Sequence, residues 1–264
     1  MNYPTRQLEL ILKDIAKKHE YKLTTIASGW INILERKGKM MPIYGYNFPN
    51  NNASITKIFD DKSGFSEILI KNKIKCFSHT YFMKGYYELS SVKTLFSSLN
   101  EDVVIKPNVG SGGNNVYHCT SFSDLEEKIN LITSSHLGFC ISPFYSYTTE
   151  YRAIILNKKI KIVYQKIKKD EEWRFNLGLG ASFSDDVSTS IINKIQKVIS
   201  SVIKILPISF CSIDFAFINN EPYIVEGNSG VMMEKYSKAD KLHYKKAFKV
   251  YEKAIKSFFA SLKK

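Results

Sequence analysis

Hydrophobic positions at the start of the chain predict a small α/β unit. A helix to about Lys18 is indicated by apolar residues at helical spacing, namely Leu8, Ile11, Leu12 and Ile15. Strand-like runs follow at 23–27, 31–34 and 41–46, which together suggest a small sheet. Residues 49–52, with a proline and three asparagines, mark the boundary of this unit.

Helical and extended patterns alternate through the rest of the chain. Helices are predicted from Asp61 to about Asn72, near 123–133, within 187–205 and within 238–262. An extended segment is predicted at 74–80, a strand ends at Ile141-Ser142, and 151–156 should pair with 160–167. Two further strands, 210–218 and 222–226, are joined by a turn at 219–221. We therefore expect an α+β fold without internal repeats.

Composition narrows the class of protein. With 264 residues and 44% hydrophobic content the chain is long enough for one composite domain or two small ones. No stretch approaches about 18 uncharged apolar residues, and no C-x-x-C pair occurs among the four cysteines. We expect a soluble cytoplasmic protein without a membrane partner, and its oligomeric state is left open.

The net charge of +13 favours polyanionic partners in general. A basic nucleic-acid-binding protein is one such class, but the lysines are scattered and form no recognition motif. Nucleic acid is therefore not the expected partner, and a lysine-rich surface also suits ATP or an acidic substrate.

Residues 103–116 are the most informative stretch. A β-branched run ends in Lys106-Pro107, and a loop of small and polar residues follows, containing Gly110, Ser111, Gly112, Gly113 and Asn114. Glycines let successive backbone N–H groups turn toward one anion. Because the lysine precedes the glycines and no helix follows, the stretch does not fit the P-loop signature. We interpret it as a strand-loop-strand phosphate lid, with an ordinary hairpin loop as the alternative.

Two acids and an amide lie around the 219–221 turn. A three-residue turn sets Asp214 opposite Glu226 on one face, whereas a two-residue turn pairs Asp214 with Val225 and sends Glu226 to the other face. We expect the first register, in which Asp214, Glu226 and Asn228 form a hard-oxygen set suited to Mg²⁺, with Mn²⁺ also possible. The alternative is that the two acids merely pair with lysine or arginine.

The strand-turn-strand arrangement ending in Glu226-x-Asn228 resembles the metal motif of the ATP-grasp superfamily, and upstream motifs follow the family order. The resemblance covers about residues 61–234 and is closest to the carboxylate-amine ligases that include glutathione synthetase and cyanophycin synthetase. It implies that ATP lies between two small sheets under a mobile lid. The implied ATP contacts are Lys62, Lys106, the loop residues 110–114, a hinge and a ribose-facing acid. The hinge comprises Ser142, Pro143, Phe144 and Tyr145, and the acid is Glu150.

The same resemblance implies the remaining roles. Arg174 and Lys106 would be catalytic, and Arg152, Arg174 and Asn176 would contact the substrate, although Arg152 could instead anchor Glu150. Tyr164 and Lys166 alternate along one strand face, which we interpret as sheet patterning.

The expected function is an ATP- and Mg²⁺-dependent ligase that joins a carboxylate to an amine on an amino acid, a peptide or a related small acid. A small-molecule kinase is the alternative, because the nucleotide motifs do not identify the nucleophile. We expect a short unit at 1–60, which could form the acceptor side, and a nucleotide-binding region at 61–264 with a lid subdomain at about 101–145.

Overall fold

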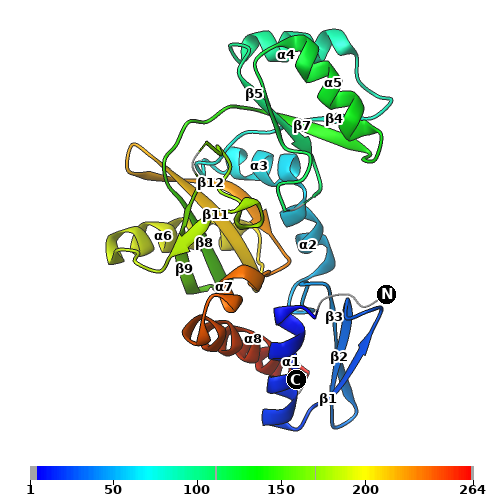
Figure 1. The fold of residues 1–264 in the computed structure, drawn as a ribbon, viewed down its shortest axis with the longest axis vertical. Helices are drawn as coiled ribbons and strands as arrows, with labels where there is room; N and C mark the ends of the chain where they lie inside the picture. Colours follow the sequence, from blue (N-terminus) through cyan, green and yellow to red (C-terminus); the bar gives the residue numbers. More distant parts are fainter. Residues whose placement is uncertain (1–4, 111, 170, 263–264) are drawn as a thin grey trace.

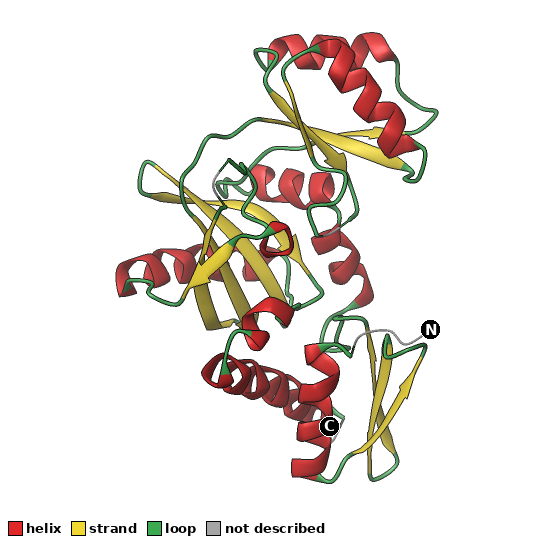
Figure 2. Ribbon diagram, viewed as in Figure 1, coloured by secondary structure: helices red, strands yellow, loops and turns green. Residues whose placement is uncertain are grey.

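The computed structural model describes residues 5–110, 112–169 and 171–262. Three sheets, each antiparallel, follow one another along the long axis of the molecule (Figures 1 and 2). The α+β fold expected from the sequence is confirmed. No helix within the described ranges is long and apolar enough to cross a membrane.

The amino-terminal unit has the predicted helix and small sheet. Its elements are α1 (Gln7–His19), β1 (Lys22–Ile26), β2 (Ile31–Arg36) and β3 (Lys39–Tyr44). The last helix, α8 (Lys241–Ser261), packs against them, so that Leu8 and Leu12 of α1 share one core with Tyr251 and Ile255 of α8. The two ends of the chain thus close one core, while a division into units at residue 60 stays a prediction.

Two consecutive helices lead from this unit to the rest of the chain. The sequence predicted only the second of them, α3 (Lys62–Lys71), and missed α2 (Ala53–Asp60). Asn52 caps α2 by accepting a hydrogen bond from the Ser54 amide, and Asp61 caps α3 by accepting one from the Gly64 amide. Asp61 therefore both ends the first helix and begins the second.

The sheet drawn at the top of Figure 1 carries the lid loop. Its strand order is β4 (Thr80–Met83), β7 (Gly138–Pro143), β5 (Val103–Pro107) and β6 (Tyr117–Cys119). Two helices, α4 (Leu89–Ser98) and α5 (Phe122–Thr133), cover one face of it. Because β4 and α4 belong to this unit and were not predicted, it extends upstream of the expected start near residue 101.

The central sheet has five strands in the order β10 (Ser182–Ser184), β9 (Lys159–Ile167), β8 (Glu150–Leu156), β11 (Phe210–Ile218) and β12 (Glu221–Asn228). One face packs against α2, α3 and α6 (Thr189–Ile205). The opposite face is apolar at one end, where it meets α8 and α7 (Glu234–Lys238), and polar at the other. A short 3₁₀ turn, η1 (Leu177–Leu179), precedes β10.

The β11–β12 hairpin reaches the expected pairing by another route. The predicted three-residue turn is wrong, since Ile218 pairs with Glu221 and only Asn219 and Asn220 form the turn, both with positive φ. A bulge after Asp214 then adds one residue to β12, so that Asp214 lies opposite Glu226. The two carboxylates consequently share a face of the sheet, as predicted.

Candidate active site

The polar end of the central sheet gathers acids and bases from four neighbouring strands. Alternation along the strands places Glu150 and Arg152 of β8 on the same face as Asp214 of β11 and Lys166 of β9. Glu150, Lys166 and Asp214 are buried, so their charges require partners inside the protein.

A closed network of ion pairs supplies those partners. Arg152 binds Asp214 through two hydrogen bonds, Nε to Oδ1 at 2.8 Å and Nη2 to Oδ2 at 2.6 Å. Lys166 Nζ bridges the two acids, at 2.9 Å from Asp214 Oδ2 and 2.6 Å from Glu150 Oε1. The Tyr147 hydroxyl donates to Glu150 Oε2 at 2.7 Å. Two positive and two negative side chains thus compensate one another.

The pKa values of the two acids in this network shift in opposite directions. Burial opposes ionisation of Asp214, but the Arg152 and Lys166 charges outweigh it and lower the pKa of this carboxyl. Burial dominates at Glu150 and raises its pKa, despite the attraction of Lys166. Asp214 is therefore held as a carboxylate, and Glu150 is the more readily protonated of the pair.

Glu226 and Asn228 lie two residues apart on β12, on the same face as Asp214. The Asn228 amide nitrogen donates to Glu226 Oε1 at 3.4 Å, and both side chains are half-buried. Within residues 5–110, 112–169 and 171–262, Asp214 Oδ1 accepts one hydrogen bond and Oδ2 accepts two, so Oδ1 retains a free lone-pair position. The alternative of pairing with arginine and lysine therefore holds for Asp214, while binding of a hard cation by the oxygens of the three side chains stays a prediction.

Lys106 approaches this acidic face from the lid sheet. It lies on β5 opposite Cys140, on the face of that sheet turned away from α4 and α5. Burial lowers the pKa of Lys106, and the nearby Glu226 and Glu150 carboxylates act against that shift. A lysine on one sheet thus lies near acids on the other, where the predicted ATP cleft between the two sheets would be.

The base of the lid loop is attached to the start of α3. The Lys62 ammonium donates to the Gly110 carbonyl at 2.9 Å, and the Lys62 amide donates to the Asn108 carbonyl at 3.2 Å. The buried Asn108 side chain donates to Asp61 at 2.9 Å and accepts from the Ser63 amide at 3.0 Å. The Asp-Lys pair and the lid, which the sequence proposed separately, therefore meet.

Backbone geometry explains the glycines of the lid. Gly112 and Gly113 both have positive φ, and a Cβ on Gly113 would stand 2.8 Å from Asn176 Nδ2. Gly110 and Asn114 are exposed, and Ser111 lies outside the described residues. The loop therefore lies against the segment that carries the predicted substrate contacts.

Arg174 holds the other side of this loop. Its guanidinium donates to both Glu172 oxygens at 2.9 Å, and Nη1 donates to the Gly113 and Val116 carbonyls at 3.4 Å each. Asn176 caps η1 by accepting a hydrogen bond from the Gly178 amide at 2.7 Å. Their roles at a substrate stay predictions, because the structure shows both residues engaged within the protein.

The predicted hinge contributes mainly aromatic rings. Tyr145 stacks on Phe77 with ring centroids 3.9 Å apart, and Phe144 stacks on His118 at 4.0 Å. Ser142 is buried and lies on the same sheet face as Lys106, and Pro143 ends the strand. Their contact with adenine stays a prediction.

The sequence did not single out His79, which lies just before β4. It is 5% exposed, and neither ring nitrogen has a hydrogen-bond partner among the described residues. Burial and the nearby Lys106 and Lys62 ammonium groups lower its pKa well below the ordinary value, with a smaller opposing effect from the Phe77 carbonyl. His79 is therefore a neutral imidazole beside the predicted phosphate-binding lysines.

The sequence placed Lys166 on a strand but did not indicate that it bridges Glu150 and Asp214. The alternation of Lys166 with Tyr164 predicts sheet patterning, and the structure shows that the patterned face is the one bearing the acids.

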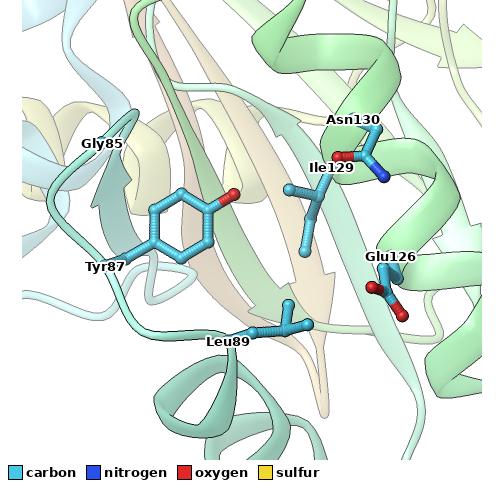
Figure 3. A pocket seen from close by; sticks show the side chains of 6 residues that line it. All are labelled: Gly85, Tyr87, Leu89, Glu126, Ile129 and Asn130. Carbon is cyan, nitrogen blue, oxygen red and sulfur yellow. The ribbon is translucent and has the colours of Figure 1, made fainter.

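A separate cavity of about 330 Å³ lies on the helical side of the lid unit, lined by Tyr87, Leu89 and Ile129 among others (Figure 3). It faces away from Lys106.

Comparison with known proteins agrees with this geometry. The sequence profile of the RimK-like ATP-grasp domain matches residues 59–250, which is most of the chain. A search of curated protein sequences found no significant match.

Solved structures share the fold at low sequence identity. D-alanine–D-alanine ligase from Bacillus anthracis superposes with a TM-score of 0.61 at 17% identity, covering 78% of this chain and 71% of the ligase. Another structure of that ligase, complexed with ATP, gives 0.57 at 16% identity, covering 69% and 60% respectively. A bifunctional glutathione synthetase from Pasteurella multocida gives 0.55 at 12% identity, covering 94% of this chain but 44% of that protein.

Proposed function

Because the chain belongs to the RimK-like ATP-grasp family, we propose that it is an ATP-dependent carboxylate-amine ligase. The observation that supports the proposal is Lys106 of the lid sheet lying near Glu226 and Glu150 of the central sheet, with the lid loop bound to Lys62 of α3. We infer an amino acid, a peptide or a related small acid as the substrate. The B. anthracis and P. multocida proteins named above are ligases and synthetases of such compounds by their names.

The residues present would divide the work of binding ATP. Lys106 and Lys62 would neutralise phosphate charge, and the lid amides would approach the phosphates closely. Glu150 would exchange the Tyr147 hydroxyl for a ribose hydroxyl, and residues 142–145 would border the adenine. Glu226 and Asn228, with Asp214 Oδ1, would hold Mg²⁺, which supplies charge neutralisation at the phosphates when bound.

The reaction would proceed in two displacements. A substrate carboxylate oxygen attacks the γ-phosphorus and ADP leaves, which gives an acylphosphate. An amine then attacks the acyl carbon, the bond between that carbon and the phosphate oxygen breaks, phosphate leaves with the electron pair, and the nitrogen loses a proton to solvent. Arg174 would stabilise the charged transition states once lid movement releases it from the Gly113 and Val116 carbonyls.

The test combines a product assay with one isosteric variant. Amino acids and short peptides are screened in pairs for ADP release, and the product is weighed by mass spectrometry. An amide product has the summed mass of its two substrates less one water. A phosphorylated hydroxyl compound would instead identify a kinase and reject the ligase.

Glu226→Gln keeps the size of the side chain and removes the charge proposed to hold the metal. We expect turnover to fall by about a hundred-fold or more while thermal unfolding stays within a few degrees of the parent protein. Glu221→Gln, on the exposed end of the same hairpin, is the matched control and should retain activity. Full activity of Glu226→Gln on a confirmed substrate would exclude the metal role.

A further inference from the structure

A second site lies outside the ATP cleft, between β9 and α8. A cavity of about 320 Å³ is lined by Lys161 of β9, Asp185, and Lys246, Lys249 and Lys253 of α8. The three α8 lysines are spaced three and four residues apart, so they form one stripe along the helix. None of its lining residues belongs to the ion-pair network or to the predicted metal set.

The groove carries uncompensated positive charge. Within the described residues, Lys161, Lys249 and Lys253 have no carboxylate within 4.0 Å, whereas Lys246 binds Asp185. Burial lowers the pKa of Lys161, and the like charges of Lys253 and Lys159 lower it further. A binding partner that brings negative charge would relieve this repulsion.

The Asp185 carboxylate requires a hydrogen-bond donor, whereas the lysines require negative charge. Its Oδ2 accepts from the Tyr236 hydroxyl at 3.1 Å, lies 3.3 Å from His243 Nε2, and also binds Lys246. Its Oδ1 is buried and has no hydrogen-bond partner in the part of the chain that the structure describes. A buried acceptor without a donor is costly, so a ligand that offers an N–H group there would be favoured.

The backbone beside these side chains is a short unpaired sheet edge. Gln196 of α6 binds the Ile160 amide at the start of β9, and β10 pairs with Gln165–Ile167. Between them, within the described residues, 162–164 pair with β8 on one side, and Lys161, Ile162 and Val163 line the groove. An exposed strand edge presents amide and carbonyl groups that can pair with an added extended segment. Carboxylates for the lysines, N–H groups for Asp185 and an extended backbone for the edge together describe a peptide.

We propose that this groove binds an extended acidic peptide, with its backbone along β9 and its carboxylates toward Lys161, Lys249 and Lys253. Single-stranded nucleic acid also has the charge, but it binds through exposed aromatic rings on which bases stack. The aromatic residue of the lining, Tyr236, is buried and stacked on Tyr164. The proposal concerns binding alone and does not depend on the proposed ligase activity.

Fluorescence anisotropy tests it directly, without ATP. The probe is a labelled six-residue glutamate peptide, and the comparison peptide is six glutamines with the same label. The Lys249→Glu/Lys253→Glu variant reverses two charges in the groove. Its matched control is Lys197→Glu/Lys204→Glu, which makes the same change at two exposed lysines seven residues apart on α6.

We expect the glutamate peptide to bind and the glutamine peptide not to bind. The groove variant should weaken binding about ten-fold or more, and the α6 variant less than about three-fold. Hydrogen exchange of the bound protein should slow at β9 and α8.

Equal weakening by both variants would show unspecific attraction to a basic protein and would overturn the proposal. So would tighter binding of a labelled oligothymidine of equal charge, or protection confined to the Lys106 cleft. Because no turnover is measured, failure here leaves the ligase proposal standing, and an inactive protein could still bind the peptide.

Discussion

Lys166→Met should be among the most destabilising substitutions in the chain. Lys166 is buried and bridges Glu150 and Asp214 at 2.6 and 2.9 Å, so its loss leaves two buried carboxylates with a single arginine. Removing one partner of a buried ion pair costs about 3–5 kcal/mol, because the remaining charge stays desolvated. With an m-value of about 1–3 kcal/mol per molar urea, the unfolding midpoint should fall by more than about 1 M.

The loss of unfolding free energy in Lys166→Met should be larger at higher pH. Burial already raises the pKa of Glu150, and loss of the lysine would raise it further. A carboxyl whose folded pKa exceeds its unfolded value stabilises the fold below the unfolded pKa and loses that contribution as pH rises. The variant should therefore be closer to the parent protein at pH 5 than at pH 8.

Urea unfolding followed by circular dichroism at those two pH values measures both effects. Lys168→Met, at an exposed position two residues away, is the control and should change the unfolding free energy by less than about 0.5 kcal/mol. Glu150→Gln combined with Lys166→Met should recover part of the loss, since it removes both ends of the pair. If the Lys166 and Lys168 variants are equally stable, the buried network does not contribute as argued.

Two other predictions concern the cleft. His79 is neutral when folded, so the parent protein should lose stability as pH falls below about 6.5, and His79→Leu should abolish that part of the loss in urea unfolding at pH 5.5 and 7.5. An unchanged pH profile would mean that the imidazole is solvated. Gly113→Ala places a methyl group 2.8 Å from Asn176 Nδ2, so ATP affinity, measured by calorimetry, should fall several-fold. Gly38→Ala has nearly the same positive φ with open space around it, and should leave ATP affinity unchanged.

Periodicity predicted the elements that bury a continuous apolar face. In α1, and in the paired strands β8 and β9, several neighbouring residues are buried at the spacing of their element. In α4, by contrast, only Val92 and Phe96 are buried, and four of its ten residues are serine. Its helical state depends on the lid sheet beneath it, and a local pattern carries little of that information.

Motif order predicted more of the contacts around the lid loop than any single motif could. It brought Lys62, Lys106 and the lid together, and the structure joins them through Asn108, which no motif marked. It could not indicate that Lys166 would lie between Glu150 and Asp214, because alternation along a strand gives the face of a residue but not what lies opposite. The pairing of β9 with β8, and of β8 with β11, brings the three side chains together, so the alternating positions of one strand also form part of a charged network.

The hairpin shows how the fold fixes the face on which Glu226 lies. A two-residue turn alone would place Val225 opposite Asp214, and the bulge corrects the parity by one residue. Gly227 follows Glu226, and a Cβ there would stand 2.7 Å from Phe59 of α2 and 3.0 Å from Phe65 of α3. Both helices can therefore pack against this face of β12 only because Gly227 lacks a side chain. That packing fixes the strand so that Glu226 and Asn228 lie on the opposite face. Helix α2, which the sequence did not predict, thus helps to position the predicted metal residues. The residue between Glu226 and Asn228 must be small because Phe59 and Phe65 pack against it.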